Sequence, residues 1–293
     1  MLSKTFKLAA IGLATAYAAI GFARAEPVKI GSKNFTEQFI VAEIYAQALE
    51  KAGIEVQKRL NLGATQIAHT ALTSGEIDLY PEYTGTALAA VVKGELTSHA
   101  DQIYGDVKKH YEKKLGLTLL KPTAINNGYA IIMLPDKAAE YKLTNLTELG
   151  PVSKDLTFGA EGTFGERKDG LPGLERVYGV KFKEFVKFAK LGIRYSALTS
   201  QQIDVSFGFS TDWQIEDNKL TVLADDKGLF PPYYLVPVVR QDALKANPKI
   251  AEVLDKLAPL LTNEKMRAMN AAVERDRKEP AEVAAEFLKA EGV

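Results

Sequence analysis

The chain has 293 residues, of which 46% are hydrophobic and 25% charged, a composition typical of a globular protein with one large or two medium domains. Lysine plus arginine and aspartate plus glutamate both total 37, so the charge balance argues against binding to nucleic acid or to an anionic membrane surface. The sequence contains no cysteine, which excludes a disulfide framework.

The first 25 residues are typical of a secretory signal peptide. Lys4 and Lys7 precede an apolar run over residues 8–22, and an Ala-Arg-Ala cleavage pattern ends at Ala25. The run is shorter than the ~20 apolar residues that a membrane span needs. Cleavage after Ala25 removes three basic residues and leaves 34 basic against 37 acidic ones, a net charge of −3. With no cysteine to carry a lipid anchor, we expect a free periplasmic protein of a Gram-negative cell.

Strand and helix patterns alternate along most of the chain, which predicts an α/β fold. The expected strands cover residues 28–31, 55–60, 76–79, 117–120, 129–134, 156–159, 182–188, 203–206, 220–224 and 235–240. The main expected helices end near residue 51 or cover residues 64–74, 84–92, 101–115, 247–261, 263–277 and 280–289. Side chains of residues 34–37 are expected to cap the first helix, and residues 80–83 are expected to lie in a loop.

The chain contains an internal repeat with a spacing of 126 residues. Residues 71–78 read ALTSGEID and residues 197–204 read ALTSQQID, so six of eight positions are identical. At the same spacing, Phe209 is the residue equivalent to Tyr83. The period is too long for a solenoid, and it predicts two similar lobes that each present an aromatic residue to a shared cleft. Chance similarity between two α/β turns stays an alternative.

Two expected crossings between the lobes, near Asn127 and Pro231, define the predicted domain organisation. After the signal peptide of residues 1–25, the first lobe begins with residues 26–127. The second lobe covers residues 128–231. The mostly helical residues 232–293 then return to the first lobe.

Motifs for catalysis or cofactor binding are absent from the sequence. His69, His99 and His110 lie far apart and lack the H-E-x-x-H spacing, so no zinc site is expected. The glycines of residues 159–165 do not follow the dinucleotide-binding order, and neither a P-loop nor a G-x-S-x-G elbow occurs. We therefore expect a binding protein without cofactor or metal, with an enzyme on the same scaffold as an alternative.

Four segments, in the same order along the chain, resemble the substrate-binding proteins of osmoprotectant ABC importers. They are residues 29–38 (KIGSKNFTEQ), 78–86 (DLYPEYTGT), 209–212 (FSTD) and 225–240 (DDKGLFPPYYLVPVVR). The resemblance implies the fold of a type II periplasmic binding protein, with two α/β lobes joined by two crossing strands. It implies a monomer that binds glycine betaine, choline, carnitine or a related quaternary amine and delivers it to an ABC permease.

The resemblance also assigns residues to the two ends of such a ligand. The cation cage comprises Tyr83, Tyr129, Phe209 and Tyr233, with Asn127 where some members carry an acidic residue. The group that binds the ligand carboxylate comprises Lys33, Thr86 and Arg167. A trimethylammonium group has no N–H to donate, so ring faces, carboxylates and carbonyls are the groups that can recognise its charge.

The sequence departs from the family pattern at two of these positions. Family cages are commonly all tyrosine, whereas Phe209 lacks the hydroxyl, and Asn127 lacks the negative charge of an acid. Each assignment has an alternative, because a tyrosine can also belong to the core and Arg167 lies in the charge run of residues 166–169. The ligand thus stays open between a glycine betaine-like solute, a larger betaine or other modified amino acid, and an ordinary amino acid.

Overall fold

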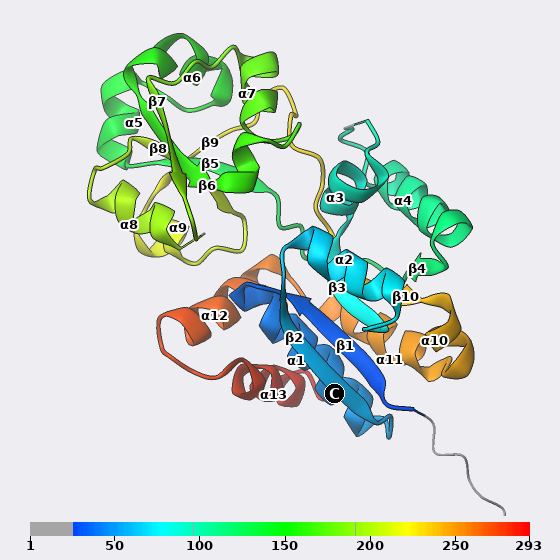
Figure 1. The fold of residues 1–293 in the computed structure, drawn as a ribbon. Coiled ribbons are helices and arrows are strands. Elements are labelled where there is room, and N and C mark those ends of the chain that lie inside the picture. Colours follow the sequence, from blue (N-terminus) through cyan, green and yellow to red (C-terminus); the bar gives the residue numbers. More distant parts are fainter. Residues whose placement is uncertain (1–25, 96, 191) are drawn as a thin grey trace, which may run out of the picture.

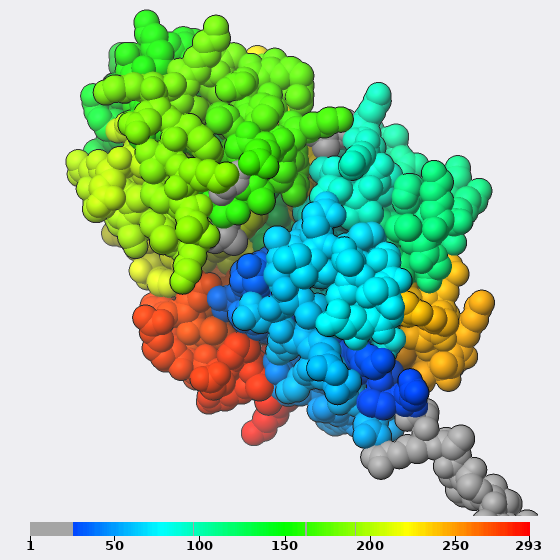
Figure 2. Space-filling model, in the orientation of Figure 1, coloured from blue at the N-terminus to red at the C-terminus, as the bar shows by residue number. Residues whose placement is uncertain are grey.

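The computed structural model describes residues 26–95, 97–190 and 192–293. The predicted signal peptide lies outside these residues. The chain forms two lobes, one built from its two ends and the other from its middle (Figure 1). In the space-filling view the two lobes meet along a boundary across the middle of the molecule (Figure 2).

Each lobe has a mixed sheet at its centre, and within the described residues each sheet has five strands. The first sheet has the order β2-β1-β3-β10-β4 and the second the order β7-β6-β8-β5-β9. The first sheet contains β1 (Val28–Lys33), β2 (Val56–Gly63), β3 (Leu79–Tyr83), β4 (Leu117–Leu119) and β10 (Leu235–Arg240). The second contains β5 (Tyr129–Met133), β6 (Thr157–Glu161), β7 (Glu184–Phe188), β8 (Val205–Phe209) and β9 (Thr221–Leu223).

Helices cover the sheets, as the alternating pattern predicts. In the first lobe they are α1 (Thr36–Lys51), α2 (Thr65–Ser74), α3 (Thr84–Thr86) with a π-helical turn Ala87–Val92, α4 (Ala100–Lys114), α10 (Gln241–Ala246), α11 (Lys249–Leu257), α12 (Asn263–Glu274) and α13 (Pro280–Ala290). In the second they are α5 (Pro135–Tyr141), α6 (Leu146–Val152), α7 (Leu171–Tyr178), α8 (Ile193–Thr199) and α9 (Gln214–Asp217). The C-terminal helices α11, α12 and α13 pack on α1, so both ends of the chain build one lobe.

Two local predictions are wrong. Residues 80–83 were expected in a loop, but they belong to β3, where Pro81 lies opposite Pro237 of β10. Since neither proline has an N–H to donate, their pairing confines the missing donors to one position of the ladder. The first helix has Phe35 as its N-cap and no side chain caps it. The side chain of Glu37, expected to cap this helix, is buried and bonds elsewhere.

The sequence repeat corresponds to a structural repeat at the same spacing of 126 residues. Strand β3 ends at Tyr83 and strand β8 ends at Phe209, and each follows a helix that ends in the repeated segment. Asp78 accepts a hydrogen bond from the backbone N–H of Lys29 at 2.8 Å, and Asp204 accepts one from Thr157 at 2.8 Å. Each aspartate therefore ties the start of its strand to the parallel neighbour, and the repeat is a shared architecture instead of a chance similarity.

Two antiparallel segments connect the lobes, one between β4 and β5 and the other between β9 and β10. They pair with each other, since Asn126 and Tyr234 form an isolated antiparallel bridge. The Asn127 N–H donates to the Tyr233 carbonyl at 3.0 Å. The expected fold class, two α/β lobes joined by two crossings, is confirmed. The exact domain boundaries at 127 and 231 stay a prediction.

The hydrophobic cores lie on both faces of each sheet, so that each lobe has its own packed interior. Among the described residues, no helix combines the length and apolar character required to cross a bilayer. Within the same residues, no group of three or more His, Asp or Glu side chains is placed to hold a metal ion.

Candidate ligand-binding site

A cleft of about 680 Å³ lies between the lobes and is lined by residues of both. Its walls contain the ends of β1, β3 and β8, so it lies at the carboxyl edge of parallel strands, where ligands commonly bind in open α/β sheets. All eight predicted site residues line it: Lys33, Tyr83, Thr86, Asn127, Tyr129, Arg167, Phe209 and Tyr233. The eight residues assigned from the sequence therefore share one cleft, and their roles in binding stay a prediction.

Three of the predicted cage rings form a single group, the Tyr129 cluster, consisting of Tyr129, Phe209 and Tyr233. The Phe209 ring stacks on Tyr129 with centroids 5.4 Å apart and planes at 27°. The Tyr233 ring meets Tyr129 edge to face, also at 5.4 Å and at 75°. These are contact distances for aromatic pairs, so a trimethylammonium group has no space between the rings. The cluster offers a ligand one continuous aromatic wall.

The fourth predicted ring, Tyr83 at the end of β3 in the first lobe, has an aromatic neighbour that the assignment from the sequence does not include. Phe35 stacks with Tyr83 at 6.5 Å and 17°, and it lines the same cleft. Phe35 stands directly after β1, in one of the segments that carry the family resemblance. That position is a signal in the sequence for a site residue, although the local pattern of residues 34–37 indicates only the start of a helix.

Lys33 brings a positive charge to the first-lobe side of the cleft. Its Nζ lies 2.6 Å from Glu82 Oε1 and 4.7 Å from the centroid of the Tyr83 ring. Glu82 is fully buried and also accepts hydrogen bonds from the Tyr80 hydroxyl and the Tyr83 N–H. Burial lowers the pKa of Lys33, while the Glu82 carboxylate opposes that shift by raising it. Lys33 is therefore a buried cation held in place by an internal partner.

Arg167 provides the second basic group and is fixed by a buried carboxylate. Asp169 accepts hydrogen bonds from Arg167 Nε at 2.8 Å and Nη2 at 2.5 Å, and from the Tyr233 hydroxyl at 2.5 Å. Asp169 is fully buried, whereas Glu166 and Lys168 are exposed. The charge run is thus only partly solvated. One aspartate positions both a predicted carboxylate-binding residue and a ring of the Tyr129 cluster.

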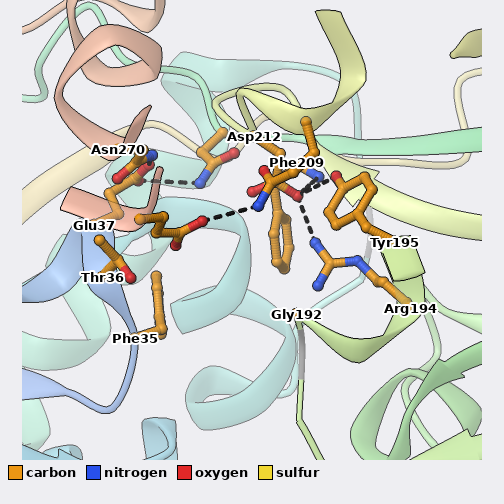
Figure 3. Close-up of a pocket in the computed structure, with 12 residues that line it drawn as sticks. Phe35, Thr36, Glu37, Gly192, Arg194, Tyr195, Phe209, Asp212 and Asn270 are labelled. Carbon is orange, nitrogen blue, oxygen red and sulfur yellow. Dashed lines mark hydrogen bonds and ion pairs between the residues drawn. The ribbon is translucent and has the colours of Figure 1, made fainter. Parts of the chain in front are cut away.

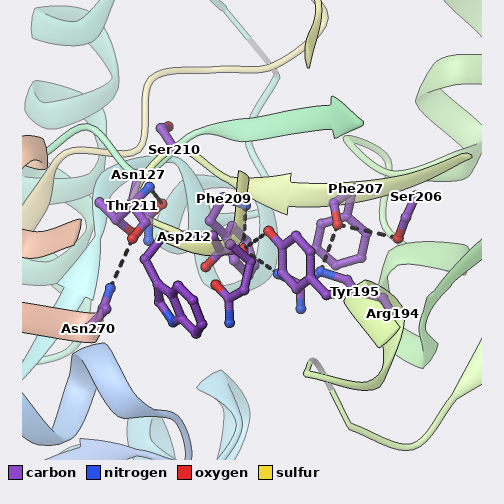
Figure 4. A network of polar contacts seen from close by, with 12 residues as sticks. Asn127, Arg194, Tyr195, Ser206, Phe207, Phe209, Ser210, Thr211, Asp212 and Asn270 are labelled. Atoms are coloured by element: carbon purple, nitrogen blue, oxygen red, sulfur yellow. Dashed lines mark hydrogen bonds and ion pairs between the residues drawn. The ribbon is translucent and has the colours of Figure 1, made fainter. Parts of the chain in front are cut away.

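Asn127, which stands where some family members have an acid, bonds to an acid from another part of the chain. Its Nδ2 donates to Glu37 Oε1 at 3.0 Å, and its Oδ1 accepts the Thr211 N–H at 3.3 Å. Glu37 also accepts from Tyr83 Oη at 2.6 Å, Thr211 Oγ1 at 2.5 Å and Asn270 Nδ2 at 3.2 Å. Its hydrogen-bond donors therefore come from both lobes and from a crossing (Figure 4 shows Asn127, Thr211 and Asn270).

Glu37 is buried and, among the described residues, forms no ion pair with a basic side chain. Burial raises the pKa of its carboxyl group, opposed by the hydrogen bonds from Thr211, Tyr83 and Asn270. Three basic residues near the cleft form ion pairs with other carboxylates: Lys33 with Glu82, Arg167 with Asp169, and Arg194 with Asp212. Glu37 thus places, behind Tyr83 and Asn127, the carboxyl group that position 127 lacks.

Comparison with known proteins identifies the family of the chain. Residues 26–290 match the family model described as the substrate binding domain of ABC-type glycine betaine transport systems. A glycine-betaine-binding protein of Pseudomonas aeruginosa is 35% identical over 281 residues, covering 92% of this chain and 90% of the relative. The ergothioneine transport permease/ergothioneine binding protein EgtU of Helicobacter pylori is 35% identical over 269 residues, covering 92% of this chain. This chain spans only 48% of the length of that second relative.

A solved structure shares the whole fold. The crystal structure of a glycine betaine/carnitine/choline ABC transporter protein superimposes with a TM-score of 0.77 at 30% identity, covering 90% of this chain and 98% of the other. This likeness confirms the type II binding-protein fold, and the family consists of binding domains instead of enzymes. The chain belongs to the substrate-binding domain family of ABC-type glycine betaine transport systems.

Proposed function

We propose that this protein, an extracytoplasmic binding protein of an ABC importer by its family, captures a betaine in the cleft between its lobes. A betaine carries a quaternary ammonium group and a carboxylate. The observation that carries the proposal is the combination, in one cleft, of aromatic rings from both lobes with the basic residues Lys33 and Arg167.

The aromatic residues suit the cation end of such a ligand. The Tyr129 cluster combines the rings of Tyr129 and Phe209 from the second lobe with Tyr233, which packs against the core of the first lobe, and the Phe35–Tyr83 pair belongs to the first lobe. Each desolvated ring face contributes about 0.5 to 2 kcal/mol to cation binding. When it is ionised, the Glu37 carboxyl group behind Tyr83 adds a negative charge that favours a cation in the cleft.

The two basic residues suit the carboxylate end because, within the described residues, each has N–H groups that no internal acceptor engages. Arg167 has five N–H donors, of which Asp169 engages one on Nε and one on Nη2. Lys33 has three, and its contacts within hydrogen-bond distance are Glu82 at 2.6 Å and Thr65 at 3.5 Å. A ligand carboxylate can therefore bind without displacing either internal acid. Charge-assisted hydrogen bonds of this kind contribute roughly 1.5 to 3 kcal/mol each.

Titration calorimetry on residues 26–293 tests the proposal. The panel contains glycine betaine, carnitine, choline, ergothioneine and proline. We expect the betaines to bind most tightly and choline more weakly, because choline lacks the carboxylate. Ergothioneine belongs in the panel because the relatives named for glycine betaine and for ergothioneine are equally similar, at 35% identity. Binding of proline alone would overturn the proposal in favour of an ordinary amino acid.

Recovery of the ligand after incubation separates a carrier from an enzyme. Glycine betaine extracted from the protein should give an unchanged NMR spectrum.

For the cellular role, we propose a monomer that is secreted to the periplasm of a Gram-negative cell and delivers its ligand to an inner-membrane permease. Fractionation of cells that express the full chain tests the compartment, and the expected result is a processed protein in the periplasmic fraction.

A further inference from the structure

Each repeated strand is followed by a residue with a hydroxyl group. Thr84 follows Tyr83 at the end of β3, and Ser210 follows Phe209 at the end of β8, again 126 residues apart. Each hydroxyl bonds to the backbone of one of the two crossings between the lobes. Neither Thr84 nor Ser210 lines the cleft. The repeat therefore attaches the ring-bearing end of each strand to a crossing in the same way.

The Thr84 hydroxyl bonds to the crossing on both sides of Tyr233. It donates to the Pro232 carbonyl at 3.2 Å and accepts the Tyr234 N–H at 3.1 Å. The Thr84 N–H also donates to the Tyr234 carbonyl at 2.9 Å. Because Thr84 is buried, removing its hydroxyl would leave the Tyr234 N–H without an acceptor. These bonds fix the backbone of Tyr233 relative to the end of β3.

Gly85 lets the Tyr233 ring lie directly against the backbone of this turn. A Cβ atom at position 85 would lie 2.8 Å from the Pro232 carbonyl oxygen and 2.8 Å from Tyr233 Cδ1. Both distances are well below ordinary van der Waals contact, so a side chain at this position would displace the ring. At the tip of the ring, the Tyr233 hydroxyl donates to Asp169 of the second lobe. Residues 84–85 and Asp169 thus set the position of the ring in the cleft.

The Ser210 hydroxyl has the equivalent relationship to Asn127 in the other crossing. Its Oγ lies 3.1 Å from the Asn126 carbonyl oxygen and 3.0 Å from the Gly128 carbonyl oxygen, on either side of Asn127. A hydroxyl carries one proton, so it donates to one of these carbonyls at a time. Figure 4 shows Ser210 near Asn127, whose side chain donates to Glu37. Ser210 therefore restrains this crossing at the residue that meets the buried carboxyl group.

We propose that Thr84 and Ser210 are positioning residues for the ligand site, Thr84 for the Tyr233 ring and Ser210 for the Asn127 side chain. The inference rests on the betaine function proposed above, in which both of these groups belong to the cation end. A binding site needs supporting contacts that hold its groups to within about 0.5 Å. The two hydroxyls provide this support through the crossings without touching the ligand. Their effect should therefore be equal for ligands that share a trimethylammonium group.

Removal of each hydroxyl tests the proposal. By calorimetry on residues 26–293, Thr84→Val and Ser210→Ala should each weaken the binding of glycine betaine and choline by about three- to tenfold, with the same factor for both ligands. Thr84→Ser and Ser210→Thr keep a hydroxyl and should bind like wild type. Ser206→Ala is the control, because the Ser206 hydroxyl donates to the Gly159 carbonyl at 2.7 Å inside the second lobe. This control should leave both affinities unchanged.

Double-mutant cycles separate positioning from a general loss of structure. Tyr233→Leu removes the ring that Thr84 holds, so in that background Thr84→Val should change the affinity by less than about twofold. In a Phe209→Leu background Thr84→Val should keep its full effect, because the Phe209 N–H donates to Asp212 at 2.9 Å and not to Thr84 (Figure 3).

For Ser210→Ala the corresponding background is Asn127→Ala. If Thr84→Val and Ser210→Ala bind like wild type, or if their effects persist undiminished in the Tyr233→Leu and Asn127→Ala backgrounds, the positioning roles are wrong while the betaine function stands. Ser210 is only half-buried, so its variants keep the test available if Thr84→Val does not fold. If wild type binds neither glycine betaine nor choline, the betaine function itself fails and this inference fails with it.

Discussion

The hydroxyl group of Tyr83 lies 2.6 Å from Glu37 Oε1 and donates a hydrogen bond to this buried carboxylate. Tyr83 is the last residue of β3, and Glu37 lies in the first turn of α1. The bond fixes the orientation of an aromatic ring in the cleft from behind, while the ring itself stays available to line the cleft. Tyr83 therefore has two separable roles, one in stability through its hydroxyl and one in binding through its ring.

Tyr83→Phe separates the two roles. The free energy of unfolding should fall by about 1 to 3 kcal/mol, because a buried carboxylate loses a donor. The affinity for glycine betaine should change little, since the ring is kept. Tyr45→Phe is the matched control, because the buried Tyr45 hydroxyl has no hydrogen-bond partner among the described residues. Urea unfolding and calorimetry measure both quantities. A Tyr83→Phe variant as stable as Tyr45→Phe would contradict the assigned hydrogen bond.

Glu37 should make stability depend on pH. Burial raises the pKa of its carboxyl above the ordinary 4.5, so between these two values the folded state binds more protons than the unfolded state. The contribution of Glu37 to stability is therefore full below about pH 4.5 and is lost as the pH rises through the raised pKa. Glu37→Gln should remove this loss. Urea unfolding of wild type and variant at several pH values tests this pH dependence. If the free energies of unfolding of the two proteins change with pH in parallel, Glu37 is not its source.

The lobe architecture was predictable from the sequence because its signals are local. Asp78 and Asp204 each lie directly before a strand in a repeated segment, and each bonds the parallel neighbour. Gly75 and Gln201, which differ in the repeat, both adopt positive φ, at 81° and 59°. The two repeats therefore share a backbone conformation even where their residues differ. This shared conformation places Tyr83 and Phe209 at equivalent positions, each at the end of its strand.

The surroundings of the site were less predictable because they depend on distant parts of the chain. Glu37 meets Tyr83 at a separation of 46 residues, Thr211 at 174 and Asn270 at 233. In sequence it looks like an ordinary acidic residue in a first helical turn. The eight residues assigned by resemblance do line one cleft, but their internal partners became visible only in the structure.

Lys33 should distinguish a betaine from choline. Lys33→Met alone leaves Glu82 buried without its cation and should lower the free energy of unfolding by about 3 to 5 kcal/mol. The double variant Lys33→Met/Glu82→Gln removes both charges and should recover part of that loss. In the double variant the affinity for glycine betaine should fall by roughly 1.5 to 3 kcal/mol, with a smaller loss for choline. Equal losses for the two ligands would show that Lys33 does not bind the carboxylate.

Phe209 tests whether the Tyr129 cluster binds a cation or only packs the second lobe. The ring stacks on Tyr129, lies 5.4 Å from the Arg194 guanidinium carbon, and packs against the core of the second lobe. Phe209→Ala would disturb packing and binding together. Phe209→Leu keeps most of the apolar volume, so stability should change by less than about 1.5 kcal/mol.

The loss of the ring in Phe209→Leu should lower affinity by about 0.5 to 2 kcal/mol. The loss should be equal for glycine betaine and choline, because both present the same trimethylammonium group. Phe209→Tyr keeps the ring face and should bind at least as well as wild type. Phe188→Leu is the control, since Phe188 packs against the core of the second lobe without lining the cleft. If Phe209→Leu and Phe188→Leu both lower the melting temperature and neither changes affinity, then Phe209 belongs to the core, and the cation is bound by the remaining rings alone.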